Sequence, residues 1–180
     1  MSIAVTGGIA EGKSTVLNLL GEMGYTTLSA DVAARQVFFD PEVNALLAAA
    51  VGATGTIQPG ELRDKIFGDS VLRRRTNAIT HPRIMHLIAE SNADFVEVPL
   101  LFEVCAQHLF LGAWVVTCGP EVQRERLTAR LGSAQLAEDI IRAQLPTEVK
   151  LSLGNRVIRT NCDLETVRRG ISEALRADSR

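Results

Sequence analysis

A glycine-rich segment near the start of the chain carries the residues best suited to chemistry. From Gly7 to Ser14 the sequence reads GGIAEGKS, which matches the pattern G-x-x-x-x-G-K-[S/T] of phosphate-binding loops. Glycines let backbone N–H groups turn around phosphate oxygens, and a helix beginning at Lys13 points the positive end of its dipole at the same anion. The motif predicts a nucleoside triphosphate site in which Lys13 reaches the β- and γ-phosphates and Ser14 ligates Mg²⁺.

The segments on either side of this loop predict a strand before it and a helix after it. Residues 3–6 form a short apolar run, and residues 16–23 place apolar side chains at helical spacing before Gly24. The alternative is a glycine-rich turn with one exposed lysine. The two flanking elements favour the phosphate-binding interpretation.

Further apolar runs predict the rest of a sheet. They are short and are separated by helical segments, which is typical of a parallel sheet covered by helices on both faces. We therefore expect a three-layer α/β fold with a five-stranded parallel sheet. The expected strands are residues 3–6, 25–29, 94–101, 113–118 and 157–159.

Two helical regions interrupt this alternation. Residues 32–92 predict a mostly helical insert, in which Asp40 caps one helix and Pro82 begins another. Residues 120–146 contain an arginine-rich helix followed by a helix that Ser133 caps. In small P-loop kinases this position carries a mobile lid, whose arginines neutralise charge on the transferring group and exclude water. A solvated helix face is the alternative for any one of these arginines.

Carboxylates at the strand ends are candidates for work on a phosphoryl acceptor, since ligands of open parallel sheets bind there. Asp31 lies one strand over from the loop and could accept the proton of an acceptor hydroxyl. Alternatively, it caps the helix that follows. Arg35 lies on the same helix face and could pair with Asp31 or bind a substrate phosphate. Glu103 could hold Mg²⁺ through water or act as a second base; otherwise it is a carboxylate at a helix start.

The composition limits the class of protein. A net charge of −2 and a pI of about 5.9 argue against a nucleic-acid-binding surface. No apolar run approaches the length of a membrane span, and the N-terminal residues lack a signal-peptide pattern. Cys105, Cys118 and Cys162 are far apart, which predicts reduced and mostly buried thiols. We expect a cytoplasmic monomer with small-molecule partners, and neither a nucleic acid nor a membrane as partner.

Motifs along nearly the whole chain resemble those of the dephospho-coenzyme A kinases. The loop alone is common to many nucleotide enzymes, whereas His-Pro-x-Ile followed by Val-Pro-Leu-Leu-Phe-Glu is distinctive of this family. The matching segments are residues 6–15, 30–35, 81–84, 98–103, 123–130 and Gln144.

This resemblance implies a P-loop kinase that uses ATP and Mg²⁺ to phosphorylate the ribose 3′-hydroxyl of dephospho-coenzyme A. Asp31 would be the catalytic base, and Asn161 would lie near the adenine. Residues 1–31, 93–119 and 147–180 would form the nucleotide-binding core, 32–92 the coenzyme A-binding insert and 120–146 the lid.

The candidate site residues form three sets, with Ser14 as the metal ligand. The catalytic set is Asp31, Lys13 and Arg130. The nucleotide-binding set is Gly7, Gly8, Ile9, Ala10, Glu11, Gly12, Lys13, Ser14, Thr15 and Asn161. The acceptor-binding set is Asp31, Arg35, His81, Pro99, Leu100 and Glu103.

The chain departs from the family pattern in the loop and the lid. The family usually has Gly-Ser where Ala10 and Glu11 stand, so we expect the Glu11 side chain to point outward, away from the triphosphate. Ile140 stands where the family has a lid arginine. Arg142 lies about 200° further around the helix and is not expected to replace it, which leaves more of the lid charge to Arg130.

Two other classes of function remain open. Another small P-loop kinase, acting on a nucleoside, a nucleotide or a sugar acid, would share the loop but not the segments at 81–84 and 99–103. A non-catalytic ATP-binding regulator is supported only by the altered lid. The guanine-reading sequence Asn-Lys-x-Asp is absent from the chain, which argues against a GTPase.

Overall fold

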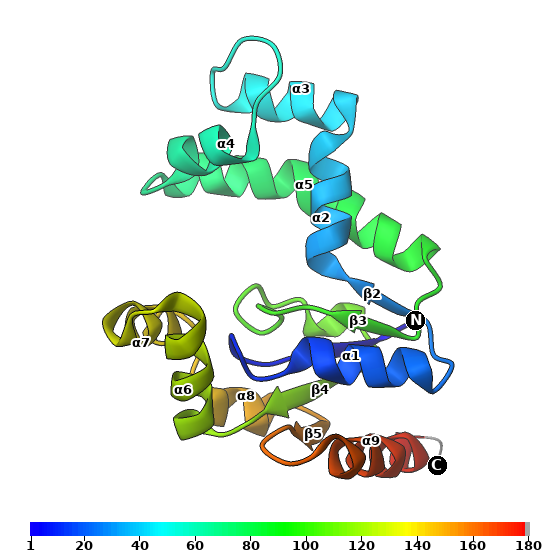
Figure 1. Cartoon of the computed structure of the whole chain (residues 1–180). Coiled ribbons are helices and arrows are strands. Elements are labelled where there is room, and N and C mark those ends of the chain that lie inside the picture. Colours follow the sequence, from blue (N-terminus) through cyan, green and yellow to red (C-terminus); the bar gives the residue numbers. More distant parts are fainter. Residues whose placement is uncertain (179–180) are drawn as a thin grey trace. The chain divides into compact units, whose positions relative to one another are not determined.

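The computed structural model describes residues 1–178 and divides into two compact units, whose elements are labelled in Figure 1. The first unit contains residues 1–27 and the chain from residue 92 onward. The second contains residues 28–91. Each unit has its own cluster of buried apolar side chains, so each is stabilised by a core of its own.

Within residues 1–178, five strands form one sheet in the order β2-β3-β1-β4-β5. Strand β1 pairs in parallel with β3 and with β4, and β4 pairs in parallel with β5. The expected α/β fold with a five-stranded parallel sheet is confirmed. The strands are β1 (Ile3–Thr6), β2 (Thr27–Ser29), β3 (Phe95–Glu97), β4 (Gly112–Thr117) and β5 (Arg156–Arg159).

Helices cover both faces of the sheet, because successive side chains of a strand point to opposite faces. Trp114 and Val116 of β4 belong to the core cluster formed with α1 (Lys13–Glu22) and α9 (Leu164–Asp178). The intervening Val115 points the other way, toward Gly154, where an added Cβ would lie 2.5 Å from Val115 Cγ2. Gly154 ends α8 (Thr147–Leu153), so α8 covers the second face.

Two helices follow β4 at the edge where the phosphate-binding loop lies. Helix α6 (Pro120–Leu131) ends at Gly132, whose φ of 70° lies in the left-handed region. Helix α7 (Ala134–Arg142) begins with the predicted cap, since Ser133 Oγ accepts the Leu136 N–H at 3.2 Å. Helix α8, directly beyond, was not predicted. No helix among residues 1–178 is long and apolar enough to cross a membrane.

The second unit is built from helices that pack around a small apolar core. Asp40 caps α3 as predicted, accepting the Val43 N–H at 3.1 Å. The buried Asn44 side chain exchanges two hydrogen bonds of 2.9 Å with the backbone of Ile57 and so fixes the loop after α3. The helices are α2 (Ala30–Phe39), α3 (Pro41–Ala50), α4 (Pro59–Ile66) and α5 (Ser70–Glu90).

Helix α5 corrects the expectation that Pro82 begins a new helix, because it runs unbroken through that residue. Proline removes one helical N–H, but α5 packs against α2, α3 and α4, and these contacts outweigh the local penalty. The N-terminal end is fixed by Asp69, whose Oδ1 accepts the N–H groups of Val71 and Leu72.

The apolar run at 94–101 forms a shorter strand than predicted, because β3 ends at Glu97 and the residues after it form turns. A short 3-10 helix, η1 (Gln107–Leu109), follows these turns. The prediction of mostly buried thiols is wrong. Cys118 is buried, whereas Cys105 and Cys162 are exposed.

Candidate phosphate-binding site

The loop between β1 and α1 has the backbone of an anion-binding nest. It follows the strand that ends at Thr6 and leads into the helix that begins at Lys13, as predicted. Ala10 has a φ of 61° and Gly12 a φ of 90°, so left-handed residues alternate with ordinary ones. Among the described residues, the backbone N–H groups of Ala10, Glu11 and Gly12 have no hydrogen-bond partner. These donors are available to phosphate oxygens.

Close packing explains two of the glycines in this loop. A Cβ on Gly7 would lie 2.3 Å from the backbone oxygen of Val116 in β4, and φ there is 148°. A Cβ on Gly12 would lie 2.8 Å from Thr160 Oγ1, just beyond β5. The loop therefore rests directly on the ends of two strands, which leaves no room for a side chain at either position.

Lys13 and Ser14 occupy the first turn of α1. The Lys13 side chain is buried, and its Nζ donates to the carbonyl oxygen of Gly8 at 2.9 Å. The Ser14 side chain is exposed. The ammonium group thus lies against the loop, and the hydroxyl is open to solvent at the helix N-terminus, where the dipole favours anions.

Glu11 contradicts the expectation that its side chain points outward. The residue is only 1% exposed, and its carboxylate accepts hydrogen bonds from the Gly8 N–H at 2.6 Å and from the Thr147 hydroxyl at 2.9 Å. The Thr117 hydroxyl at the end of β4 adds a third bond at 3.3 Å. Burial of this carboxylate is tolerated because donors from three segments converge on it. These two threonines are distant in sequence from Glu11, and no local signal connects them to it.

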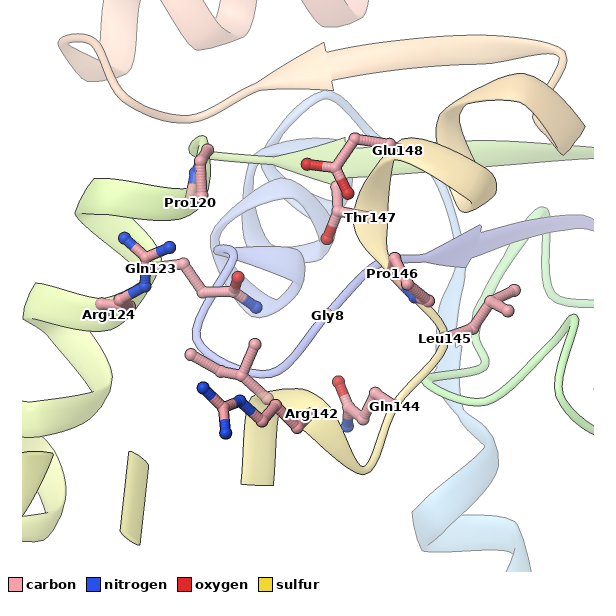
Figure 2. A pocket seen from close by; sticks show the side chains of 11 residues that line it. Gly8, Pro120, Gln123, Arg124, Arg142, Gln144, Leu145, Pro146, Thr147 and Glu148 are labelled. Atoms are coloured by element: carbon pink, nitrogen blue, oxygen red, sulfur yellow. The ribbon is translucent and has the colours of Figure 1, made fainter. Parts of the chain in front are cut away.

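A cavity of about 340 Å³ opens beside Gly8 (Figure 2). Two glutamines join its walls to the loop: Gln123 Nε2 donates to the Ile9 carbonyl, and Gln144 Oε1 accepts the Ile9 N–H, both at 3.0 Å. The lining residues are Gly8, Pro120, Gln123, Arg124, Ile141, Arg142, Gln144, Leu145, Pro146, Thr147 and Glu148.

Two arginines line this cavity, and one of them was not expected to act in the lid. Arg124 Nε lies 3.4 Å from Glu138 Oε2, and Arg142 Nε lies 3.2 Å from Glu138 Oε1, so the Glu138 carboxylate forms an ion pair with both guanidinium groups. Arg142 is helical, in the last turn of α7, and lines the cavity, so its spacing from Ile140 did not decide whether it reaches this site. Arg130, the lid arginine favoured by the sequence, is exposed in the last turn of α6 and is not among the described residues that line the cavity.

Glu103 ties two segments of the first unit together. Its Oε1 lies 2.7 Å from Lys150 Nζ and accepts the Leu145 N–H at 3.1 Å. Burial raises the pKa of the Glu103 carboxyl, but the Lys150 ammonium and the Leu145 N–H lower it, and the net effect places this pKa below its ordinary value. The residue follows β3 in a turn and does not start a helix, so the helix-dipole alternative is wrong.

The other predicted residues of the first unit flank the site. Pro99 accepts a hydrogen bond of 3.4 Å from the Thr6 hydroxyl at the end of β1, and Leu100 is 44% exposed. Asn161 is exposed directly after Thr160. The sequence did not single out Thr160, which donates from its hydroxyl to the Glu11 carbonyl at 2.7 Å.

The remaining candidates, Asp31, Arg35 and His81, lie in the second unit. Asp31 is exposed in the first turn of α2, where Ser29 holds the capping position, so the alternative role of Asp31 as helix cap is wrong. Arg35 lines a cavity of about 440 Å³ with Phe38, Phe39 and Pro59. His81 is exposed on α5.

Comparisons with known proteins match this chain to one family over nearly all its length. The family model described as dephospho-CoA kinase matches residues 1–166. The chain is 35% identical to the dephospho-CoA kinase of Moorella thermoacetica over 190 residues, covering 96% of this chain and 89% of the relative. It is 35% identical to that of Escherichia coli K12 over 173 residues, covering 88% and 84%.

Solved structures agree with the fold. A Thermus thermophilus crystal structure superposes with a TM-score of 0.83 at 30% identity, covering 98% of this chain and 97% of that one. The dephospho-CoA kinase of Campylobacter jejuni gives a TM-score of 0.59 at 22% identity, with 98% and 96% coverage. The shikimate kinase of Aquifex aeolicus gives 0.56 at 13% identity, with 99% and 98% coverage, which shows a shared fold alone.

Proposed function

The chain belongs to the dephospho-CoA kinase family. We therefore propose that it transfers the γ-phosphoryl group of ATP to the ribose 3′-hydroxyl of dephospho-coenzyme A, with the residue roles given below. The observation that carries the proposal is the loop before α1, whose N–H groups at Ala10, Glu11 and Gly12 are unpartnered among the described residues. These groups would hold the β- and γ-phosphates of the donor. Lys13 would turn from the Gly8 carbonyl to the phosphates, since it already lies against the loop.

The donor chemistry also calls for Mg²⁺. Among the described residues, no group of three His, Cys, Asp or Glu side chains could hold a metal by itself. Mg²⁺ often keeps several waters and binds through substrate phosphates, and the exposed Ser14 hydroxyl fits such a site as a single protein ligand. When bound, the ion would neutralise charge on the β- and γ-phosphates.

Asp31 is the proposed catalytic base. Its carboxylate is exposed and is not used to cap α2, so it is available to a substrate hydroxyl. It would accept the proton of the 3′-hydroxyl as that oxygen attacks the γ-phosphorus, and ADP would leave in line with the attack.

Arginines of residues 120–146, the proposed lid, would stabilise charge on the transferring group. Arg124 and Arg142 are supported by their place in the cavity wall beside Gly8. Arg130 remains a candidate on the family resemblance alone. The guanidinium groups of Arg124 and Arg142 are held by Glu138 before the donor arrives, which lowers the cost of orienting them.

The second unit is the proposed coenzyme A-binding part. Its cavity at Arg35 combines a guanidinium group with the aromatic rings of Phe38 and Phe39, and Phe39 is 56% exposed. This chemistry suits a phosphorylated ligand with apolar portions. His81, Pro99, Leu100 and Glu103 are further proposed acceptor contacts, and Asn161 a proposed adenine contact, on the resemblance. We also propose a cytoplasmic monomer; the three free cysteines are consistent with a reducing compartment.

The assay that tests this function measures ADP formation with dephospho-coenzyme A as acceptor. Parallel reactions contain shikimate, gluconate, nucleosides or nucleoside monophosphates, and a control contains no acceptor. We expect dephospho-coenzyme A to accelerate ADP formation far above every other acceptor. Equal rates with another acceptor would favour a different small kinase, and no acceleration by any of them would favour an ATP-binding regulator.

A further inference from the structure

The carboxylate of Glu11 is a junction between the phosphate-binding loop and two distant segments. Its Oε2 accepts the N–H of Gly8 within the loop. Its Oε1 accepts the hydroxyls of Thr117, at the end of β4, and of Thr147, at the start of α8. A serine, the residue that the resemblance predicts here, has too short a side chain to make all three bonds. The junction is therefore a feature of this chain rather than of the loop motif.

Thr147 belongs to a segment that is anchored at several points. Residues 144–150, which we call the hinge segment, directly follow the proposed lid helices. Gln144 bonds the Ile9 N–H of the loop, and the Leu145 N–H bonds Glu103. Lys150, with no solvent exposure, pairs with the same glutamate at 2.7 Å. The hinge segment thus has two connections to the loop and two to the turn after β3, as Figure 2 illustrates for Gln144 and Thr147 around Gly8.

We propose that Glu11 is a positioning residue that couples nucleotide binding in the loop to the hinge segment on which the lid turns. This inference rests on the proposed function, in which the loop holds the donor and residues 120–146 are the lid. A nucleotide that orders the loop also orders the Glu11 side chain, because the backbone N–H of the same residue would bind the nucleotide. The bond to Thr147 then transmits that order to the hinge segment, and by linkage an ordered hinge segment strengthens nucleotide binding.

The geometry separates this role from that of a contact to the nucleotide. The carboxylate oxygens of Glu11 already have three donors, and a carboxylate repels phosphate. Its backbone N–H, in contrast, is unpartnered among the described residues and available to an anion. The backbone N–H of Glu11 therefore faces the nucleotide site, whereas its side chain bonds the hinge segment.

Amide hydrogen exchange tests the coupling. The wild-type protein is compared with and without Mg²⁺ and adenylyl imidodiphosphate, a non-hydrolysable ATP analogue. We expect the analogue to slow exchange at residues 8–14 and also at the hinge-segment amides 144, 145 and 147–150. If residues 8–14 do not respond in the wild type, the proposed donor site itself is wrong, and the coupling falls with it.

Two variants then isolate the junction. In Glu11→Ser and in Thr147→Val we expect the analogue to slow exchange at residues 8–14 as before, while its effect on the hinge segment falls at least fivefold. We also expect KM for ATP to rise about fivefold while kcat changes less than twofold. The double variant should match the single variants, because each removes the same connection. Thr27→Val, which removes a hydroxyl from an exposed position of β2, is the matched control and should leave exchange and KM unchanged.

Three outcomes would contradict the proposed coupling. Undiminished slowing of the hinge segment in both variants would overturn the proposal, as would multiplicative effects on KM in the double variant. A lower melting temperature with unchanged exchange response and unchanged KM would show that Glu11 only stabilises the fold. If Glu11→Ser does not fold, Thr147→Val still tests the proposal, since Glu11 keeps its bonds to Gly8 and Thr117.

Discussion

The carboxylate of Glu103 lies 2.7 Å from the ammonium of Lys150, whose side chain is fully buried. Glu103 belongs to the turns after β3, and Lys150 belongs to α8, so the pair joins two segments that border the phosphate-binding loop. The two partners differ in solvent access, because the Glu103 side chain is 20% exposed. Loss of either partner should therefore have unequal effects.

Glu103→Gln should lower the free energy of unfolding by about 3 kcal/mol, because it leaves the buried Lys150 ammonium without its counter-ion. Lys150→Met should cost less, since water can reach the freed carboxylate. Urea unfolding of each variant measures the effect. In the double variant Glu103→Gln/Lys150→Met most of the loss should be recovered; costs that simply add would contradict a coupled pair.

The same carboxylate should make stability depend on pH. The pKa of Glu103 is lowered in the folded protein from an ordinary value of 4.5, so in the window below 4.5 the unfolded chain binds more protons. The contribution of Glu103 to stability is thus fully present above pH 4.5 and is lost as the pH falls through the folded-state pKa.

The measurement is the difference in unfolding free energy between the wild type and Glu103→Gln at a series of pH values. Taking this difference removes the contributions of Asp94 and Asp163, whose pKa values are also lowered. A difference that stays constant from pH 6 down through the acid range would contradict the assignment.

Arg142→Ala should lower kcat about 10²-fold with little change in KM for ATP, because the guanidinium group in the cavity wall would act on charge that develops during transfer. Steady-state kinetics with saturating dephospho-coenzyme A measure this effect. Arg168→Ala is the matched control, since Arg168 pairs with Glu22 on the surface away from the cavity lining. A rate equal to that of the control would show that Arg142 does not act in the transfer, and would leave Arg130 as the candidate that stabilises charge on the transferring group.

Asp31→Asn should reduce turnover by 10²- to 10⁴-fold, the range typical of general base catalysis, and leave the affinity for ATP nearly intact. Single-turnover kinetics and calorimetric titration with the non-hydrolysable ATP analogue measure the two quantities. Asp31 does not cap α2, so loss of the charge should not destabilise the helix start by more than the small dipole effect. Retained turnover would exclude Asp31 as the base.

Local sequence patterns predicted most of the fold and the backbone of the site. The glycines, the apolar run before them and the helical spacing after them are close in sequence, and they define a strand, a loop and a helix wherever they occur. The caps at Asp40 and Ser133 were predicted for the same reason, since each bonds a backbone N–H within three residues.

Features that depend on distant residues could not be predicted in this way. Glu11 turns inward because Thr117 and Thr147, more than a hundred residues away in sequence, donate to it. Helix α5 continues through Pro82 because neighbouring helices pack along it. Arg142 lines a cavity whose wall also contains Gly8, Pro120 and Gln123, and spacing within one helix does not reveal a wall built from several segments.

Phosphoryl transfer to the ribose 3′-hydroxyl is tested by the identity of the product. Purified protein is incubated with ATP, Mg²⁺ and dephospho-coenzyme A, and the product is assigned by phosphorus NMR and mass spectrometry. We expect one added phosphoryl group, present as a monoester on the ribose 3′-oxygen, in amounts equal to the ADP formed. ADP formation without this monoester, or a phosphoryl group on another oxygen, would contradict the proposed function.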